Sequence, residues 1–412
     1  MNVLLLGLNK SWAEILSENE NINFYVIEEP ELWVNKKLSV KDFPNVKEVK
    51  LLKYQFKNEN EMDEIIYYAK KIKADVIIPG LEYSVAPASY VASLLNLPNL
   101  GILAAKTLTN KYSLRKKIGN TKIAQPRYKK VGNMEAVKEF FEGPIIIKPT
   151  NRQASAGVIK VFNKKDIPFS WKHALGVDEG VNVTEREIEV DFLVEELLIG
   201  QEVSVEVLVN KGKIQFFNIT VKETSDGKFP VEIGHYVPGD FPNKIKTNLR
   251  QNMEILISEL DVQTGILHAE WIIVNDAPYL IECAGRAPGD YIFQLIKMAY
   301  GFCPYSAMLD IFLSKTTKIN QQEERGVAIA FLSANENGYL KSLKGFDELN
   351  CKPEVLRTGM FAEVGDKVTT LHSSWDRLGM IICSGTSGKE AFENTQINKE
   401  NIKIKIENFG SN

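Results

Sequence analysis

Short apolar runs alternate with amphipathic stretches along the first hundred residues of the chain. The runs are apolar enough for strands buried on both faces, and the stretches between them have helical spacing. We expect strands at 2–7, 23–27 and 75–79 and helices at 11–16, 62–71 and 85–95. Strand–helix alternation predicts a parallel sheet covered by helices. Leu97-Pro98-Asn99 closes the unit, so residues 1–100 are expected to form a first domain.

The pattern changes after residue 100. In 101–185, a basic helix is expected at 111–118, followed by two short strands at 144–149 and 158–162. The small polar residues 150–157 join these strands, which predicts a mobile lid. We therefore expect 101–185 to be a small lid domain.

Strands dominate residues 186–320, which are expected to form a larger domain. The expected strands are 192–198, 203–209, 213–220, 266–274 and 277–283, with a helix near 244–260. The first two strands are expected to meet in a hairpin, and Asn275-Asp276 is expected to turn the last two into another. Residues 321–412 are strand-rich but carry no motif. They are expected to complete the third domain and to cover one wall of the cleft. The predicted fold class is α/β.

Composition narrows the function classes. The chain is 44% apolar and 25% charged, with a net charge of −3 and no basic block, so nucleic acid is not an expected partner. Its apolar runs fall short of the ~20 residues of a membrane span, and no secretion signal is apparent. Four scattered cysteines and four histidines argue against disulfides and a zinc site. A cytoplasmic protein is expected.

Lys111, Lys148 and the loop Gln153-Ala154-Ser155-Ala156-Gly157 form the first candidate site. A triphosphate requires positive charge and close backbone N–H donors, which lysines and small residues supply. The alternative is two solvated lysines beside an ordinary hairpin turn.

The second candidate is the pair Glu195 and Glu202, at the ends of the expected hairpin. A carboxylate can accept hydrogen bonds from an adenine amino group or from ribose hydroxyls. The alternative is a surface hairpin with outward-facing charges.

The third candidate, Glu270 and Glu282, is the most informative. These carboxylates lie twelve residues apart in paired strands, and Arg286 follows. Hard cations prefer oxygen ligands, and magnesium completes its shell with phosphate and water. Arg286 suits a transferring phosphate or a carboxylate. The alternative is a structural Glu–Arg ion pair.

The order of these parts resembles the ATP-grasp superfamily along residues ~100–320, and the preceding α/β unit resembles its usual N-terminal domain. The resemblance implies that Lys111 and Lys148 contact ATP phosphates and that residues 153–157 close over them. It implies that Glu195, with the backbone of Glu196 and Leu197, binds adenine and that Glu202 binds ribose. Glu270 and Glu282 would hold magnesium, two ions in all, which Mn²⁺ could replace.

One position departs from the usual pattern. Many members have Glu-x-Asn at the second metal strand, whereas this chain has Ala284 two residues after Glu282. One metal ion would therefore depend more on phosphate and water.

Within the superfamily, the chain resembles the L-amino-acid α-ligases, which make dipeptides of the bacilysin type. The segments that carry this resemblance are residues 144–157, 231–238 and 286–290. The resemblance implies that Glu82 and Glu232 hold the amino group of the first amino acid, and that His235 and Arg286 approach its carboxylate or acyl phosphate. The alternatives are a loop histidine for His235 and a helix N-terminal charge for Glu82.

Asp290, with Glu82 and Glu232, would surround the substrate with carboxylates. This favours a basic first substrate and a narrower resemblance to arginine-using ligases of the rhizocticin type. The expected partners are small-molecule amino acids, and a homodimer is expected by analogy. Open alternatives are another ATP-grasp carboxylate–amine ligase, a carboxylase, a D-amino-acid ligase, a dinucleotide-dependent oxidoreductase and a non-catalytic nucleotide-binding regulator.

Overall fold

The structure is a computed structural model of the 412-residue chain. It describes residues 1–43, 45–55, 62–176, 191–317, 319–320 and 322–408. The expected boundary at residues 185 and 186 lies outside the described residues. Among those residues, no helix combines the length and hydrophobicity that crossing a membrane requires.

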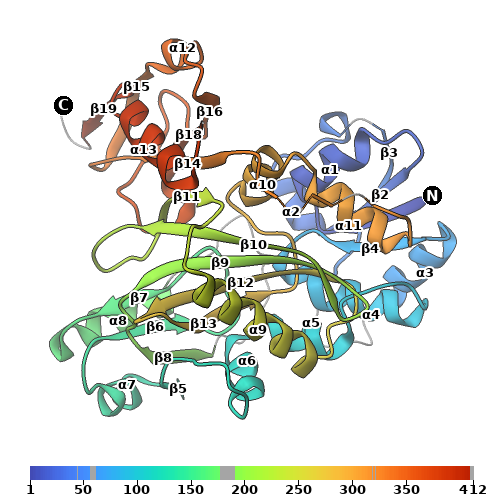
Figure 1. The fold of residues 1–412 in the computed structure, drawn as a ribbon, viewed down its shortest axis with the longest axis horizontal. Coiled ribbons are helices and arrows are strands. Elements are labelled where there is room, and N and C mark those ends of the chain that lie inside the picture. Colours follow the sequence, from blue (N-terminus) through green and yellow to red (C-terminus); the bar gives the residue numbers. More distant parts are fainter. Residues whose placement is uncertain (44, 56–61, 177–190, 318, 321, 409–412) are drawn as a thin grey trace.

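The N-terminal part forms a four-stranded parallel sheet in the order β3-β2-β1-β4, drawn in blue in Figure 1. Its elements are β1 (Asn2–Leu6), α1 (Lys10–Ser17), β2 (Asn23–Glu28), α2 (Pro30–Asn35), β3 (Val46–Leu51), α3 (Asp63–Lys71), β4 (Val76–Pro79) and α4 (Val85–Leu94). The predicted parallel sheet is confirmed. Helix α2 and strand β3 are not among the predicted elements. Strand β3 is an edge strand with no buried position in its burial pattern, so it lacks an apolar run.

A second, antiparallel sheet has the order β5-β8-β6-β7 and is drawn in teal and green. It contains β5 (Tyr128–Val131), β6 (Ile145–Pro149), β7 (Ile159–Val161) and β8 (Phe192–Glu196), with α7 (Met134–Phe140) and α8 (Ile167–Gly176). Helices α5 (Ile102–Leu108) and α6 (Lys111–Ile118) precede it. The strand pair that flanks residues 150–158 is confirmed by the pairing of β6 with β7. We call this unit the small sheet.

The largest sheet has eight antiparallel strands in the order β13-β12-β9-β10-β11-β14-β18-β16. They are β9 (Gln201–Asn210), β10 (Lys213–Thr224), β11 (Glu232–Val237), β12 (Gly265–Val274), β13 (Ala277–Ala284), β14 (Gly326–Ser333), β16 (Val355–Met360) and β18 (Arg377–Gly385). Its helices are α9 (Asn243–Glu259), α10 (Ile292–Tyr300), α11 (Pro304–Phe312) and α13 (Gly388–Lys399). The hairpin turned by Asn275-Asp276 is confirmed, and both turn residues have positive φ.

The expected hairpin between 192–198 and 203–209 is wrong. Strand β8 pairs with β5 and β6 in the small sheet, whereas β9 pairs with β10 and β12 in the large one. Residues 197–200 cross between the two sheets. Two adjacent apolar strands with a glycine between them resemble a hairpin in sequence, because nothing local shows that each has a partner elsewhere. The crossing places Glu195 and Glu202 on different sheets.

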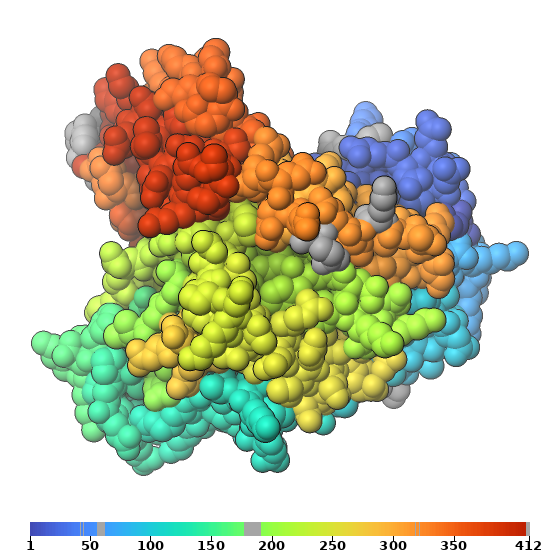
Figure 2. Space-filling view, viewed as in Figure 1, coloured from blue at the N-terminus to red at the C-terminus, as the bar shows by residue number. Residues whose placement is uncertain are grey.

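Residues 326–408 form a C-terminal lobe that includes the strands β14, β16 and β18 of the large sheet and is drawn in orange and red in Figures 1 and 2. A three-stranded sheet, β17-β15-β19, completes it beside β16 and β18. The further elements are β15 (Gly338–Lys344), α12 (Phe346–Leu349), β17 (Lys367–Val368) and β19 (Lys403–Asn408). In the described residues, the 3₁₀ helices include η1 (Val40–Asp42), η3 (Glu82–Ser84), η4 (Lys164–Asp166) and η6 (Ser374–Asp376).

Strand β9 shows how the large sheet divides the core. Val203, Val205, Val207 and Val209 are buried in one cluster with α9, whereas Leu208 belongs to the cluster against α10, α11 and the N-terminal sheet. This alternation follows from the two-residue period of a strand. Glu206 lies fully buried on the same face as Leu208, so a carboxylate is held inside the sheet near its centre.

An aromatic contact connects the small sheet to the C-terminal lobe. The ring of Phe229 lies 4.9 Å from that of His173 on α8 and 4.6 Å from that of His372 in the lobe. The backbone N–H of Lys160 on β7 also donates to the Lys228 carbonyl at 2.9 Å. The loop at 225–231 therefore contacts both units.

Gly200 tests the crossing between the sheets. A Cβ at this position would overlap the backbone carbonyl of Ile273 on β12. We expect Gly200→Ala to lower the free energy of unfolding by about 1–3 kcal/mol, since the backbone must move. Urea denaturation measures this change. Gly132→Ala is the matched control, because nothing lies within 4 Å of its Cβ position. Equal effects of the two substitutions would contradict the close approach.

Candidate functional site

A cavity of about 730 Å³ lies between the small sheet, the large sheet and the carboxyl end of β4. It brings together most of the residues that the sequence predicts: Glu82, Lys111, Lys148, Gln153, Ala154, Ser155, Glu195, Glu196, Leu197, Glu202, Glu232, Glu270, Glu282, Arg286 and Asp290. Ala156, Gly157 and His235 are not in its lining. Residues that are far apart in the sequence thus line the same cavity.

The carboxylates of Glu270 and Glu282 lie on adjacent strands, because these two residues are directly opposed in the β12–β13 register. The register shifts immediately afterwards, so that Trp271 faces Leu280. Glu270 forms an ion pair with Lys222, and Glu282 lies 3.0 Å from the Lys111 Nζ. Both carboxylates thus already have a cationic partner.

The donor set fits magnesium that also binds phosphate. Within the part of the chain that the structure describes, no group of three or more His, Cys, Asp or Glu side chains could hold a metal by itself. Two carboxylates at a cavity wall match the few protein ligands that Mg²⁺ takes when phosphates and water fill its shell. Both side chains remain about a quarter exposed to the cavity, at 23% for Glu270 and 29% for Glu282.

Buried charges surround the opposite wall. Lys148 donates to Glu195 at 2.7 Å, and Arg115 binds the same carboxylate at 2.8 and 3.3 Å. Burial lowers the pKa of Lys148. Burial alone would raise the pKa of Glu195, but Arg115 and Lys148 outweigh it and hold that pKa below its ordinary value. The predicted contact of Glu195 with adenine stays a prediction, since both oxygens already accept.

The loop after β6 has an unusual backbone. Ala154, Ser155 and Gly157 all have positive φ, between 54° and 76°. Ala154 and Ser155 line the cavity, whereas Ala156 is buried. The Lys111 Nζ donates to the Arg152 carbonyl at 2.7 Å, which ties α6 to this loop. Small residues permit the conformation, and their contact with phosphate stays a prediction.

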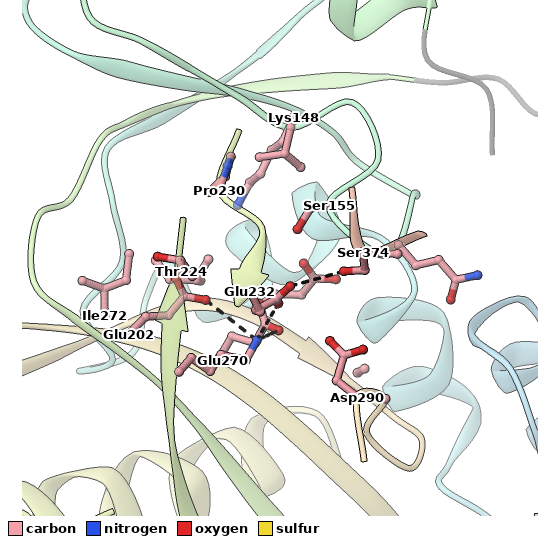
Figure 3. A pocket seen from close by; sticks show the side chains of 18 of the residues that line it. Lys148, Ser155, Glu202, Thr224, Pro230, Glu232, Glu270, Ile272, Asp290 and Ser374 are labelled. Carbon is pink, nitrogen blue, oxygen red and sulfur yellow. Dashed lines mark hydrogen bonds and ion pairs between the residues drawn. The ribbon is translucent and has the colours of Figure 1, made fainter. Parts of the chain in front are cut away.

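At the other end of the cavity, three predicted carboxylates are each paired. Glu82 accepts from the Arg286 Nε at 2.6 Å, and Glu232 accepts from Lys222 at 3.1 Å. Asp290 accepts twice from Arg377. Figure 3 shows Glu202, Glu232 and Glu270 directed toward one point, and each of the three carboxylates forms an ion pair with the Lys222 ammonium. Glu82, Glu232 and Asp290 each therefore already have a cationic partner in the structure.

His235 lies behind this wall. Its ring is fully buried and does not line the cavity, with its Nε2 3.7 Å from Asp290 and its ring edge against Phe331. Direct contact of His235 with a substrate is therefore not provided by this geometry. Any influence on the cavity passes through Asp290, and the predicted catalytic role stays a prediction.

Comparison with known proteins identifies two domains. Residues 141–294 match the ATP-grasp domain, and residues 330–407 match the L-amino acid ligase C-terminal domain 2. The ATP-grasp match spans the strands that carry Glu270 and Glu282 and the loop after β6, which are features that the cavity brings together.

Similar proteins include alanine–anticapsin ligase of Bacillus subtilis, 23% identical over 61% of this chain and 57% of that protein. D-alanine–D-alanine ligase of Staphylococcus carnosus is 25% identical over 48% of this chain and 57% of that protein. The match thus spans little more than half the length of these curated relatives.

Two solved structures share the fold. An L-amino acid ligase from Bacillus licheniformis has a TM-score of 0.82 at 18% identity, over 99% of both chains. Phosphoribosylglycinamide synthetase from Anaerococcus prevotii has a TM-score of 0.71 at 18% identity, over 98% of this chain and 99% of that one.

Sequence reasoning missed three cations of the site: Arg115, Lys222 and Arg377. Arg115 could have been found, because it follows Lys111 by four residues and so lies on the same face of α6. Lys222 and Arg377 carry no local signal. Each acquires its role only through strand pairing in the large sheet, which places it beside carboxylates far away in sequence.

A buried network of polar side chains contacts Glu270 through His268. The Nδ1 of His268 lies 2.9 Å from the Glu206 carboxylate, and its Nε2 lies 3.4 Å from Glu270. Ser204 and Thr220 donate to Glu206. Burial alone would raise the pKa of Glu206, but the bond to His268 and its neighbours lowers it. These contacts fix the direction of the Glu270 side chain.

Glu202 gives a prediction for pH dependence. Burial, together with Glu270 and Glu232 and against the opposing effect of Lys222, raises the pKa of Glu202 to about 7. The folded chain thus holds this proton more tightly than the unfolded chain, whose carboxyl pKa is about 4.3. Glu202 therefore makes the free energy of unfolding fall as pH rises from about 4.5 to about 7.

We expect Glu202→Gln to remove this component, so that the variant gains stability relative to the native chain between about pH 5 and about pH 7. Urea denaturation at both pH values measures it. A stability difference between variant and native chain that is the same at both pH values would contradict the shifted pKa.

Proposed function

We propose that the protein is an ATP- and magnesium-dependent ligase that joins two L-amino acids into a dipeptide and forms ADP and phosphate. The observation that carries this proposal is the opposed pair Glu270 and Glu282, in one cavity with Lys111, Lys148 and Arg286. The ATP-grasp and L-amino acid ligase domains support the same reaction class. A non-catalytic nucleotide binder would not require Arg286 in the same cavity as the two carboxylates.

Carboxylates are poor acyl donors, so the reaction requires an activated acid. In the proposed mechanism, the carboxylate of the first amino acid attacks the γ-phosphate of ATP, which gives an acyl phosphate and ADP. The amine of the second amino acid then displaces phosphate. Lys111 and Lys148 offset the charge of the two anions that approach each other. Bound Mg²⁺, held by Glu270 and Glu282, would add charge stabilisation at the phosphates.

Two hydrogen bonds fix the orientation of the Arg286 guanidinium. Its Nε donates to Glu82, and its Nη1 donates to the Ala287 carbonyl at 2.9 Å, so the plane of the guanidinium is fixed. A planar guanidinium can bind two oxygens of a carboxylate or phosphate. We propose that Arg286 stabilises the acyl phosphate and the attack on it.

The identity of the first amino acid remains a proposal. Among the described residues that line the cavity, ten carry carboxylates and six are lysine or arginine. This acidic surplus favours a cationic substrate through its overall field. The individual pairings of Glu82, Glu232 and Asp290 mean that a guanidinium would share these acids with resident cations. Because acidic residues outnumber basic ones in the cavity lining, we propose a basic first substrate, with arginine as the first candidate.

Related proposals follow from the resemblance. Two magnesium ions would bind with ATP, and Mn²⁺ could replace them. The protein would act in the cytoplasm as a homodimer.

Glu282→Gln tests the metal pair. The amide keeps the shape of the side chain but cannot neutralise a divalent cation. We expect amino-acid-dependent ADP release to fall by about a hundredfold or more at saturating ATP. A coupled ADP assay measures the rate. Glu139→Gln, on exposed α7 and outside the cavity lining, is the control. Undiminished activity of Glu282→Gln would remove the metal assignment.

A screen of single amino acids and pairs tests the chemistry and the substrate. We expect ADP and phosphate as products, a hydroxamate when hydroxylamine replaces the second amino acid, and the fastest turnover with arginine or lysine as first substrate. Product analysis by mass spectrometry measures all three. Release of AMP and pyrophosphate would rule out the acyl phosphate, whereas equal turnover of neutral and basic amino acids would end the proposed preference alone.

A further inference from the structure

The C-terminal lobe reaches the cavity through one short segment. Ser374 and Trp375, in the 3₁₀ helix η6, line the cavity, and Arg377 begins β18 immediately behind them. Figure 3 shows Ser374 beside Glu232 on β11. The Ser374 hydroxyl lies 3.4 Å from the Glu232 carboxylate. The segment thus joins a lobe that is distant in sequence to the wall where the amino acid is proposed to bind.

Arg377 binds both residues of that wall. Its Nη1 and Nη2 donate to the two carboxylate oxygens of Asp290 at 2.7 and 3.2 Å. Its Nε and Nη2 also donate to the Glu232 backbone carbonyl at 3.2 and 2.7 Å. The Glu232 carboxylate also lies 3.4 Å from the Arg377 Nη2. One guanidinium therefore fixes a carboxylate on the loop before α10 and the first residue of β11.

The surroundings of Arg377 leave it little freedom. Its side chain is 3% exposed, and its guanidinium lies over the ring of Phe331 at 3.8 Å. A buried charge is tolerated only with such partners. Asp290 has a positive φ of 52°, a conformation that L residues adopt with strain. Its place in the wall thus depends on an external anchor, which Arg377 supplies.

We propose that Arg377 is a positioning residue for the amino-acid subsite, holding Glu232 and Asp290 where they receive the ammonium group or side chain of the first substrate. The C-terminal lobe then supplies part of the substrate site as well as covering it. This inference rests on the proposed ligase function. It assigns no contact with ATP to Arg377, since the metal pair and both phosphate-facing lysines lie on other strands and helices.

Arg377→Met and Arg377→Lys test the inference in the full-length protein. Methionine leaves Asp290 and the Glu232 carbonyl without their donor. We expect the KM for the first amino acid to rise on the order of tenfold to a hundredfold, with the KM for ATP nearly unchanged. Lysine keeps the charge but lacks the planar fork, so we expect an intermediate rise. Initial rates of ADP release measure both KM values.

Asn398→Ala is the control for a purely structural effect. Asn398 is buried in the same lobe, where it accepts from Lys352 at 2.7 Å and donates to the Asn394 carbonyl at 2.9 Å, and it does not line the cavity. We expect it to lower the melting temperature without changing the KM for the amino acid.

The possible results separate the inference from the proposed function. A selective rise of the amino-acid KM in the Arg377 variants supports the inference. Lower melting temperature with an unchanged amino-acid KM, as in Asn398→Ala, overturns it while leaving the ligase function intact. If Arg377→Met does not fold, Arg377→Lys decides by the same criterion. If the native protein shows no amino-acid-dependent ADP release with any amino acid, the proposed function fails and the inference falls with it.

Discussion

The arrangement of the site depends on one fully buried guanidinium, that of Arg115. It binds Glu195 on β8, and it donates at 2.8 Å to the carbonyls of both Leu280 and Ile281 on β13. Isolated burial of such a charge would cost several kcal/mol, so its partners are effectively obligatory. Because α6, the small sheet and β13 share this residue, none of the three can shift without leaving a buried charge or carbonyl unpaired. Removal of the partner on any side would be strongly destabilising.

The contact also explains the local geometry of β13. Consecutive carbonyls of a regular strand point in opposite directions, but the register shift at Ile281 allows two of them to receive one guanidinium. The shift follows directly after the opposed pair Glu270 and Glu282. Arg115 thus stabilises the irregularity beside which the two acids are held together. Similarly, Lys222 pairs with Glu270 and Lys111 pairs with Glu282, which offsets the repulsion between the two carboxylates. The two acids can therefore lie side by side without a bound cation.

Much of this was accessible from the sequence, and the remainder was not for identifiable reasons. Apolar periodicity located the parallel sheet, and the turn Asn275-Asp276 gave the pairing that opposes Glu270 to Glu282. Periodicity does not reveal partners, which is why 192–209 was interpreted as one hairpin although its two strands enter different sheets. For the same reason, the sequence indicates the carboxylates of the cavity and the cations Lys111, Lys148 and Arg286, but not Arg115, Lys222 and Arg377. Lys222 meets acids from β9, β11 and β12, and only the tertiary fold determines that encounter.

The ring of Phe229 between His173 and His372 has a mechanical consequence. Contacts of this kind contribute about 0.5–1.5 kcal/mol each beyond the burial of area. The small sheet and the C-terminal lobe are therefore joined here by tilted and edge-on ring contacts of modest strength. Breaking this junction costs far less free energy than breaking the buried ion pairs of Arg115, so the two units are held to each other less firmly than the strands that Arg115 connects.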